Sequence, residues 1–520
     1  MRPGRREQPG RTVPSMRSSH AMPTASPAHR GARLIVVLVL ATLGVTPGCG
    51  RIDRALQRQI AMEADGLTPA VDDDKAVMRT AVEAHEKGLG TPDGGPLAPD
   101  AGLGDYVSLA LRRNPAIRKS VRDLQVLGYR VPQVTSLDDP MVNLIPPTGD
   151  MTETAAGMMQ GGGSVTQKIP FPGKLDARGR VAEQAVRMAF YALADVRIRT
   201  VAEVQRAYYA YYLAEVSIAV SRQSERLLRQ IREVAAARYR AGAATQQDVL
   251  RAEVQLYALT NEVITFEQRR ATARARLNAL MDRPVAAALP GPAPFDLAAV
   301  EWRLPAALDQ ALESNPRLAG LRERIGRDLE VIKLARLSYY PDLSLGFGYT
   351  GIASSGISPV ATGDDTWNLA LGFNLPIWWQ RLRAHVLESN AQALASVEEY
   401  AEVRNMVSFE VQDALVKIDT EYRQAVLLRD LIVPRAWQTV EVSTSAYRAG
   451  DLEFTALIDN WRAWLDFSLR YHAALAQLEQ RFADLQQLLG AQVPRRASAA
   501  APSEHVESPA AAGYGKESAR

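Results

Sequence analysis

The chain carries the same series of landmarks twice, and the second series lies about 200 residues after the first. Asn114-Pro115 returns as Asn315-Pro316, and the Tyr-Arg-Ala-Gly run of Tyr239–Gly242 returns at Tyr447–Gly450. The spacing between the two series drifts by only a few residues, as loop insertions within one duplicated fold would leave it. This repetition predicts two copies of a single structural unit.

Each copy reads as a helix, a pair of strands, a very long helix, a tight turn and a further helix. We place the repeats at residues 101–283 and 302–490, with a linker at 284–301. Residues 49–100 are assigned to an N-terminal extension, and residues 491–520, rich in Ala, Ser and Pro, to a disordered tail. The 61 basic and 58 acidic residues nearly balance, so we expect no nucleic-acid partner.

The N-terminal region has the features of an export signal, which we assign to residues 1–48. The apolar run Leu34–Val45 follows a basic stretch and is too short to span a bilayer as a mature helix. Thr46–Cys49 resembles the lipobox of bacterial lipoproteins, with Thr46 where leucine is usual. We therefore predict lipid attachment at Cys49, the single cysteine of the chain. An incidental cysteine in a cleaved signal is the alternative.

Two segments of the second repeat alternate strictly between apolar residues and small or polar ones. Such alternation is typical of strands with lipid or a core on one side and water on the other. The segment between them, Gly351–Asp365, is rich in Gly and Ser and is predicted to be an exposed loop. The predicted lipid-facing residues are Leu343, Leu345, Phe347, Trp367, Leu369, Leu371 and Phe373.

The first repeat contains a weaker pair of strands, at Met141–Ile145 and Ser164–Ile169. Four strands cannot close a barrel, because closure around even a filled interior takes about eight. Hydrocarbon does not tolerate an open sheet edge. If these strands enter a membrane, several chains must therefore share one barrel. A soluble sandwich, or a hairpin that caps a helical bundle, is the alternative.

Each repeat also contains a helix far longer than a compact domain needs. One glycine and no proline occur in Asp176–Tyr239, so an unbroken helix there would be roughly 95 Å long. Pro434 interrupts the equivalent stretch Arg381–Tyr447, and we predict a kink there. A seven-residue apolar period in this second stretch predicts left-handed supercoiling against neighbouring helices. The periodic residues are Val411, Ile418, Ala425 and Ile432, with Val407, Ala414 and Leu428 between them.

A tight turn follows each long helix and reverses the chain. Glycine at a helix end supplies the left-handed conformation of such a stop, which is the predicted role of Gly242 and Gly450. Second helices are predicted at about Gln246–Leu280 and Thr455–Leu489. Each repeat thus forms a long antiparallel helical hairpin whose tip lies far from the strands.

Taken together, these features resemble the TolC-type outer-membrane efflux ducts over nearly all of residues 101–490. The resemblance rests on the duplicated halves, the Asn-Pro after each first helix, the proline-bearing segment after the strands and the Tyr-x-x-Gly of each tip. Arg238–Gly242 and Asp248–Leu250 are similar to the first tip motif of that family. The resemblance implies a mainly α-helical fold with a membrane β-barrel portion. In that fold a homotrimer shares a twelve-stranded β-barrel above an α-barrel of helical hairpins.

The resemblance also implies a function: a passive exit duct in the outer membrane of a Gram-negative bacterium, with a periplasmic tunnel. Its tips would meet a periplasmic adaptor protein through Tyr239, Gly242, Tyr447 and Gly450, and an inner-membrane pump would supply the energy. The cargo would be small molecules or metal ions. Gln167–Lys174 is similar to a segment common in ducts that serve heavy-metal pumps of the resistance-nodulation-division class.

Three tip residues match gating positions of the family. Asp459, nine residues after Gly450, matches an acidic constriction position, and Tyr447 matches a tyrosine that holds the closed state. The second acidic position is Ala456, although Asp248 supplies an acid at the equivalent place in the first hairpin. Three copies of Asp459 around a narrow axis would repel one another and favour cations. A solvated tip acid is the alternative.

Other function classes find little support in the sequence. The six His are scattered singly, and no His, Cys or Met cluster suggests a metal site or a cofactor. Gly346–Gly351 matches the dinucleotide pattern but lies within a predicted strand, without the required helix after it. We therefore expect no enzyme. A soluble coiled-coil-rich envelope scaffold remains the alternative, although it leaves the alternation of Trp367–Phe373 unexplained.

Overall fold

The computed structural model describes residues 97–497 except 99, 147–152, 155, 294, 296, 301–302, 355–358, 360–361 and 492–494. These residues lie within one compact unit of the chain, Ala64–Arg520. The predicted export signal, the predicted lipid attachment at Cys49 and nearly all of the N-terminal extension fall outside the described residues, as does most of the predicted tail.

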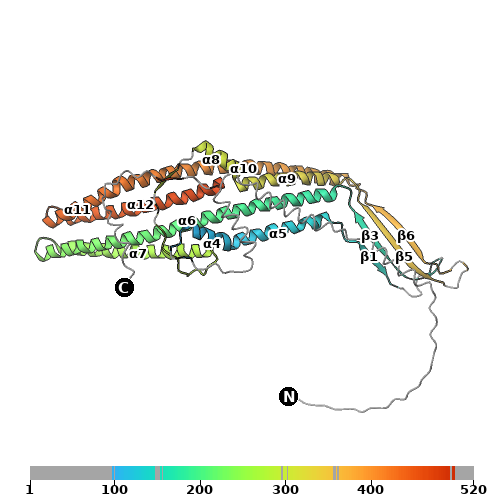
Figure 1. The fold of residues 1–520 in the computed structure, drawn as a ribbon, viewed down its shortest axis with the longest axis horizontal. Helices are drawn as coiled ribbons and strands as arrows, with labels where there is room; N and C mark the ends of the chain where they lie inside the picture. The colour runs from blue at the N-terminus through green and yellow to red at the C-terminus, as the bar shows by residue number, and fades with distance from the viewer. Residues whose placement is uncertain are drawn as a thin grey trace, which may run out of the picture. The chain divides into compact units, whose positions relative to one another are not determined.

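The described residues repeat one order of elements, which confirms the predicted duplication (Figure 1). The first repeat consists of α4 (Leu103–Arg113), α5 (Pro115–Thr135), β1 (Met141–Ile145), β2 (Glu153–Thr154), β3 (Gly157–Ile169), α6 (Lys174–Arg240) and α7 (Gln246–Leu280). The second consists of α8 (Leu304–Ser314), α9 (Pro316–Leu337), β5 (Leu343–Ala353), β6 (Thr366–Phe373), α10 (Trp379–Leu427), η2 (Leu428–Ile432), α11 (Val433–Ala449) and α12 (Phe454–Leu489).

The repeated Asn-Pro dipeptide joins three helix ends. Asn114 and Asn315 each end one helix, and their side-chain oxygens accept a hydrogen bond from the backbone N–H two residues on, at 2.8 and 2.9 Å. The following proline starts the next helix, where its missing N–H is not needed. Each asparagine also donates through Nδ2 to the carbonyl of the helix that ends its own repeat, at Leu280 or Leu488, 2.9 Å away.

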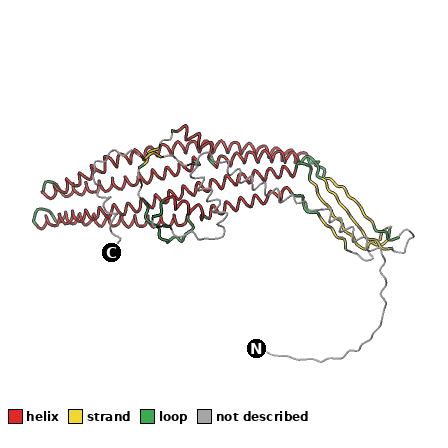
Figure 2. Tube along the Cα trace, in the orientation of Figure 1, coloured by secondary structure: helices red, strands yellow, loops and turns green. Residues whose placement is uncertain are grey.

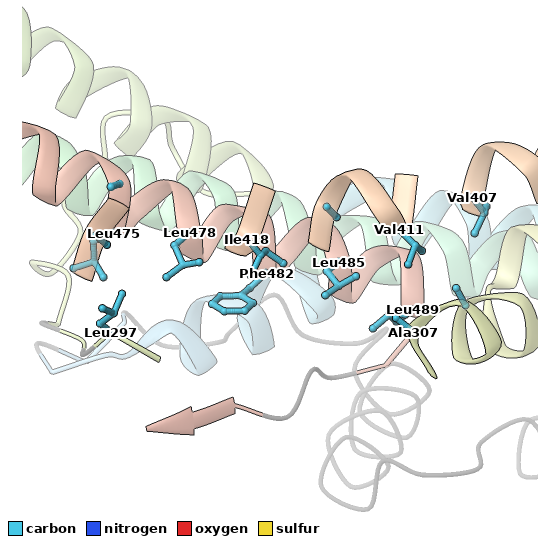
Figure 3. Close-up of a cluster of buried hydrophobic side chains, with 14 of the residues drawn as sticks. Leu297, Ala307, Val407, Val411, Ile418, Leu475, Leu478, Phe482, Leu485 and Leu489 are labelled. Carbon is cyan, nitrogen blue, oxygen red and sulfur yellow. The ribbon is translucent and has the colours of Figure 1, made fainter. Parts of the chain in front are cut away.

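The long helices lie side by side along the unit (Figures 1 and 2). α6 packs against α5, α7, α9 and α12, and α10 packs against α9 and α12. The predicted seam is confirmed, because Val411, Ile418 and Ala425 are all buried against α12 residues that include Phe482. Figure 3 shows Ile418 beside Phe482 in this core. Among the described residues, no helix combines the length and the apolar character that crossing a membrane requires.

A π-helical turn, η2, ends two residues before Pro434, where we predicted a kink. Proline has no N–H to donate and its ring clashes with the preceding turn, which a wider turn relieves. The turn also shifts the phase of the seam. Val411, Ile418 and Ala425 are buried at seven-residue spacing, but the buried Val440 and Tyr447 lie one residue out of step with them. η2 therefore absorbs one additional residue.

The equivalent helix of the first repeat contains no such shift. α6 runs unbroken for 67 residues. Along most of its length a buried residue recurs at intervals of seven. These residues are Val186, Leu193, Thr200, Ala207, Ala214, Ser221, Leu228 and Ala235. The two repeats therefore differ in the helix that leads to each tip.

One antiparallel sheet combines the strands of both repeats in the order β1-β3-β5-β6, with the short β2 beside β3. The two central strands are longer than predicted, since β3 begins at Gly157 and β5 continues to Ala353, into the expected loop. A close approach of β3 to β5 explains this extension. A Cβ on Gly162 would lie 2.5 Å from the carbonyl oxygen of Tyr349, so glycine permits pairing there.

The predicted linker and tail require a correction. β4 (Ala298–Val300), in the linker, pairs antiparallel with β7 (Arg495–Ala497), at the start of the tail that we predicted to be disordered. These strands of three residues are too short for an alternating pattern to be read in the sequence. Their pairing depends on bringing two distant segments together.

Candidate functional site: the hairpin tips and the exposed sheet

The two hairpin tips reverse the chain through glycines in the left-handed region, as predicted. Gly242 has φ 74° and Gly450 has φ 99°, and both follow the last turn of a long helix. The N–H of Gly242 donates to the Tyr239 carbonyl at 3.0 Å, and that of Gly450 donates to the Ala446 carbonyl at 3.0 Å. In both tips a backbone hydrogen bond therefore completes the last turn of the helix, although the side chains around the two tips differ.

Tyr447 connects the tip of the second hairpin to that of the first. Its side chain is buried and its ring packs edge to face against Phe454, with 5.5 Å between ring centroids. Its hydroxyl donates to Asp248 Oδ2 at 3.4 Å, a long hydrogen bond that reaches from α11 to α7. The structure thus brings together two of the three predicted gating residues.

Arg238 of α6 completes this connection. Its guanidinium lies over the Tyr447 ring, 4.6 Å from the centroid, and Nη1 donates to the Tyr447 carbonyl at the end of α11. Nη2 donates to the carbonyl of Ala243 at 3.1 Å. We refer to Arg238, Tyr447 and Asp248 as the tip clasp. The clasp joins three helices from two repeats.

The environment of the clasp keeps the Tyr447 phenol protonated. Burial raises the pKa of Tyr447 to about 12, the neighbouring Asp248 carboxylate also raises it, and Arg238 opposes the shift. The hydroxyl therefore remains a hydrogen-bond donor at neutral pH.

The remaining predicted tip residues lie outside the clasp. Tyr239, the counterpart of Tyr447, is 46% exposed, so the duplicated tyrosines occupy opposite environments. Asp459 is exposed on α12 and shares no hydrogen bond or ion pair with Tyr447 or Asp248 within the described part of the chain. The role of Asp459 at a constriction stays a prediction.

Arg238 is a residue to which our sequence reasoning gave no role. It lies four residues before Gly242, whereas the second copy has Ala446 four residues before Gly450. That difference between otherwise matching tips was the available signal. Arg238 can contact Tyr447 because α6 approaches α11 at the tips, and the sequence does not show this approach.

A second connection between the repeats lies where the helices meet the sheet. Lys174 Nζ, at the start of α6, lies 2.6 Å from Asp342 Oδ1, next to the first residue of β5, and both side chains are largely buried. The Phe171 N–H donates to the same oxygen at 2.9 Å. Burial raises the pKa of Asp342, but the Lys174 and Phe171 hydrogen bonds outweigh it and hold this pKa below its usual value. Asp342 is therefore ionised and paired at neutral pH.

The sheet presents apolar side chains to its surroundings. All seven predicted lipid-facing residues are exposed, from 37% for Leu343 to 74% for Leu369. Phe347 lies opposite Leu369 in the register of β5 and β6, so these side chains share one face. In a single chain both faces of β6 are exposed, so contact with lipid stays a prediction.

The described residues contain no group of three or more His, Cys, Asp or Glu side chains arranged to hold a metal ion. The tyrosines of α6 that cluster at Tyr208–Tyr212 belong to a hydrophobic core with α4, and Tyr106 packs edge to face on Tyr208 at 5.3 Å. These aromatic side chains stabilise helix packing.

A family model described as outer membrane efflux protein matches residues 106–283 and 307–491 of the chain. This match covers more than half of the chain and decides its family. The chain is a member of the outer membrane efflux protein family. The two matched stretches cover nearly all of the two repeats, including their strands and hairpins. This outer-membrane efflux protein therefore carries the clasp and the exposed sheet on a known type of duct fold, and its predicted fold class is confirmed.

Individual relatives agree with this membership. The chain is 24% identical over 400 residues to the cobalt-zinc-cadmium resistance protein CzcC of Cupriavidus metallidurans, covering 76% of this chain and 90% of that protein. It is 25% identical over 458 residues to the outer membrane protein OprJ of Pseudomonas aeruginosa, covering 85% and 89%. The structure of the outer membrane protein VceC from Vibrio cholerae superposes with a TM-score of 0.63 at 16% identity, covering 75% and 96%, which shows a shared fold.

Proposed function

We propose that this outer-membrane efflux protein acts as a homotrimeric, passive exit duct without catalytic activity. The open edges of the sheet carry the proposal. β1 and β6 are edge strands, and Leu144, Trp367 and Leu369 on them are more than 70% exposed. Unpaired edges with apolar side chains require a partner in a membrane. Three copies would supply about twelve strands, enough to close a barrel.

The helices support association with further copies. α7 buries one seam against the rest of the hairpins, through Ala252, Leu256 and Leu259. It exposes a second apolar seam on another face, which consists of Leu250, Val254, Tyr257 and Ile264. A helix with two apolar seams fits between two neighbours, whereas the described residues supply a neighbour for one seam.

The outer helix on the side of the array away from α7 also has exposed apolar residues. α7 packs on α6, α6 on α12, and α12 on α11, so α7 and the α10–α11 helix are the outer members. Phe409 and Val416 of α10 and Val442 of α11 are exposed there. A contact between two different faces generates a ring when its rotation closes. This arrangement supports a trimer with α7 of one protomer against α10–α11 of the next.

The tips would face a periplasmic adaptor protein and an inner-membrane pump. Tyr239, Gly242 and Gly450 lie at the exposed ends of the hairpins, and Tyr447 and Asp248 hold the tips together. In this proposal Asp459 lines the narrowest part of the tunnel. Replacing Asp459 with Asn should then reduce cation selectivity in planar bilayers. Unchanged selectivity would place Asp459 away from the constriction.

The cargo would be small molecules or metal ions. The name of the Cupriavidus relative, a cobalt-zinc-cadmium resistance protein, supports metal ions. Deletion of the gene from its host should then lower the inhibitory concentrations of cobalt, zinc and cadmium salts, with recovery on complementation. A strain that becomes sensitive only to organic compounds would exclude the metal-ion class.

The decisive experiment is electron microscopy of detergent-extracted membranes, with the mass measured on the same sample. A three-fold particle of three chain masses would support the duct. A monomer in the aqueous fraction would favour the alternative, a soluble coiled-coil-rich envelope scaffold.

A further inference from the structure

A cavity of about 410 Å³ that is open to the surface lies between the two helices of the second hairpin, at the end of η2. Its wall consists of Leu431, Ile432, Arg435, Ala436, Thr439, Asn460, Ala463 and Phe467. The phase shift at η2 helps to shape it, because Val440 rather than Thr439 turns into the core and Thr439 is left at the cavity. Asn460 Nδ2 donates to Ser443 Oγ at 2.8 Å and ties α12 to α11 beside the cavity.

The wall combines an apolar surface with one cation. Five of its eight residues are apolar, and none is acidic. The Arg435 side chain is exposed, and its hydrogen-bond partner in the described part of the chain is the amide oxygen of Gln438, at 3.2 Å. Its guanidinium retains donors for a further acceptor. Thr439 and Asn460 add short polar groups next to it.

The cavity lies on the same side of α12 as the proposed constriction. Ala456, Asn460, Ala463 and Phe467 follow one another at helical spacing and share one face of α12. Asp459 lies four residues before Ala463 and borders the same face. If Asp459 lines the tunnel, as the proposed function has it, the cavity opens into the tunnel within about two helical turns of Asp459.

We propose that this cavity is a binding site for small amphipathic anions inside the tunnel. Its volume falls in the range of about 300 to 1,000 Å³ that is usual for small-molecule sites. The apolar wall takes a hydrophobic body, and Arg435 binds the anionic group through charge-assisted hydrogen bonds. The site rests on the proposed function for its access to the tunnel, and a trimer presents three copies of it around the axis.

Current block in planar bilayers tests the site with the full chain as a purified channel. The probes are 2-naphthalenesulfonate and its uncharged analogue 2-naphthalenemethanol, added on the tip side. Arg435→Gln should raise the half-blocking concentration of the sulfonate about tenfold, by loss of a charge-assisted bond at a partly exposed site. It should leave the weaker block by the uncharged probe unchanged. Ala463→Trp, which fills the cavity, should weaken the effect of both probes.

Arg423→Gln is the matched control, because Arg423 is an exposed arginine on α10 whose ion pair is with Asp419 and not with the cavity. Equal block of the wild type, Arg435→Gln and Ala463→Trp channels by the sulfonate would overturn the site. Normal channel conductance in the same experiment would leave the proposed duct intact.

Equilibrium dialysis of 2-naphthalenesulfonate against the detergent-solubilised protein separates the site from its access. Binding that Arg435→Gln and Ala463→Trp both weaken, without block of the current, would keep the pocket but place it away from the tunnel and so overturn the proposal. Absence of any conductance would overturn the proposed duct itself, and with it the tunnel position of the site.

Discussion

At the scale of single residues, the tip clasp turns a duplicated sequence into an asymmetric site. Tyr239 and Tyr447 occupy equivalent positions, yet only Tyr447 is buried, beneath the Arg238 guanidinium and next to Asp248. The clasp combines a cation over an aromatic ring with a hydrogen bond to the last turn of α11. Such contacts favour one relative position of the two tips, and a tip that moves must break them.

Replacing Arg238 with Gln should weaken the clasp. Loss of the ring contact and the carbonyl hydrogen bond should cost about 1.4 kcal/mol, which corresponds to about a tenfold rise in the population of separated tips. We expect larger or more frequent openings in single-channel recordings. Arg240→Gln is the control, because the partner of the Arg240 side chain in the described part of the chain is the Ala236 carbonyl of its own helix, at 3.4 Å. Identical recordings for both variants would mean that Arg238 does not restrain the tips.

His472 should make stability depend on pH in the acidic range. Burial lowers the pKa of His472 from 6.5 to about 4, so the folded protein holds this imidazole neutral. Its contribution to stability is fully present above pH 6.5 and is lost as the pH falls toward 4, at a slope of up to about 1.4 kcal/mol per pH unit.

The thermal unfolding temperature measured at pH 7 and pH 5 tests this effect. The unfolding temperature of the wild type should fall more between pH 7 and pH 5 than that of His472→Gln. A substitution at the exposed His385 should leave the fall as large as in the wild type. A drop of the same size in the His472 variant would assign the pH dependence to other groups.

At the scale of elements, the two long helices show how two copies of one sequence unit come to differ in structure. α6 keeps a single seven-residue seam from Val186 to Ala235, whereas the second copy changes phase by one residue at η2. A helix can absorb one additional residue in a wide turn and keep its core contacts on both sides. This turn also lies at the proposed anion site, so the phase shift and the cavity belong to the same feature.

Removing the additional residue should straighten this helix. Deletion of Leu431, whose side chain is exposed, together with Pro434→Ala should bring Val440 and Tyr447 into step with Ala425 and keep the core. We expect the melting temperature measured by circular dichroism to stay close to that of the wild type, and binding of 2-naphthalenesulfonate to be lost.

Deletion of the exposed Arg226 from α6 is the matched comparison. It would rotate one part of that helix by about 100° relative to the other and take one part of its seam out of the core. A much lower melting temperature is expected there. An equal fall in melting temperature for the two deletion variants would show that η2 does not accommodate an additional residue.

At the scale of the whole molecule, the sheet and the outer helices remain incomplete in a single chain. Among the described residues, no strand pairs with the outer edges of β1 and β6, and none covers the second apolar seam of α7. The Lys174–Asp342 pair holds the start of α6 against the start of β5, which fixes how the helices leave the sheet. In the proposed trimeric duct, neighbouring copies would cover these edges and this seam.

Replacing Leu369 with Arg tests whether this face of the sheet meets lipid. A charge near the middle of the hydrocarbon should cost about 2 to 4 kcal/mol and reduce the yield of heat-resistant trimer on gels. Asn368→Arg, one residue earlier and on the other face of β6, should assemble normally. Normal assembly of both variants would remove the support for lipid contact at Leu369.

The sequence alone determined the features that depend on neighbouring residues. The duplication, the glycine turns, the bounds of α7 and the buried seam of α10 follow from local spacing and from the conformational limits of Gly and Pro. The packing of the two repeats was needed to show which duplicated tyrosine is buried, that Arg238 reaches Tyr447, and that β3 pairs with β5. The physical reason is that these contacts join residues about 200 positions apart, and their energies depend on packing between the repeats rather than on local conformation.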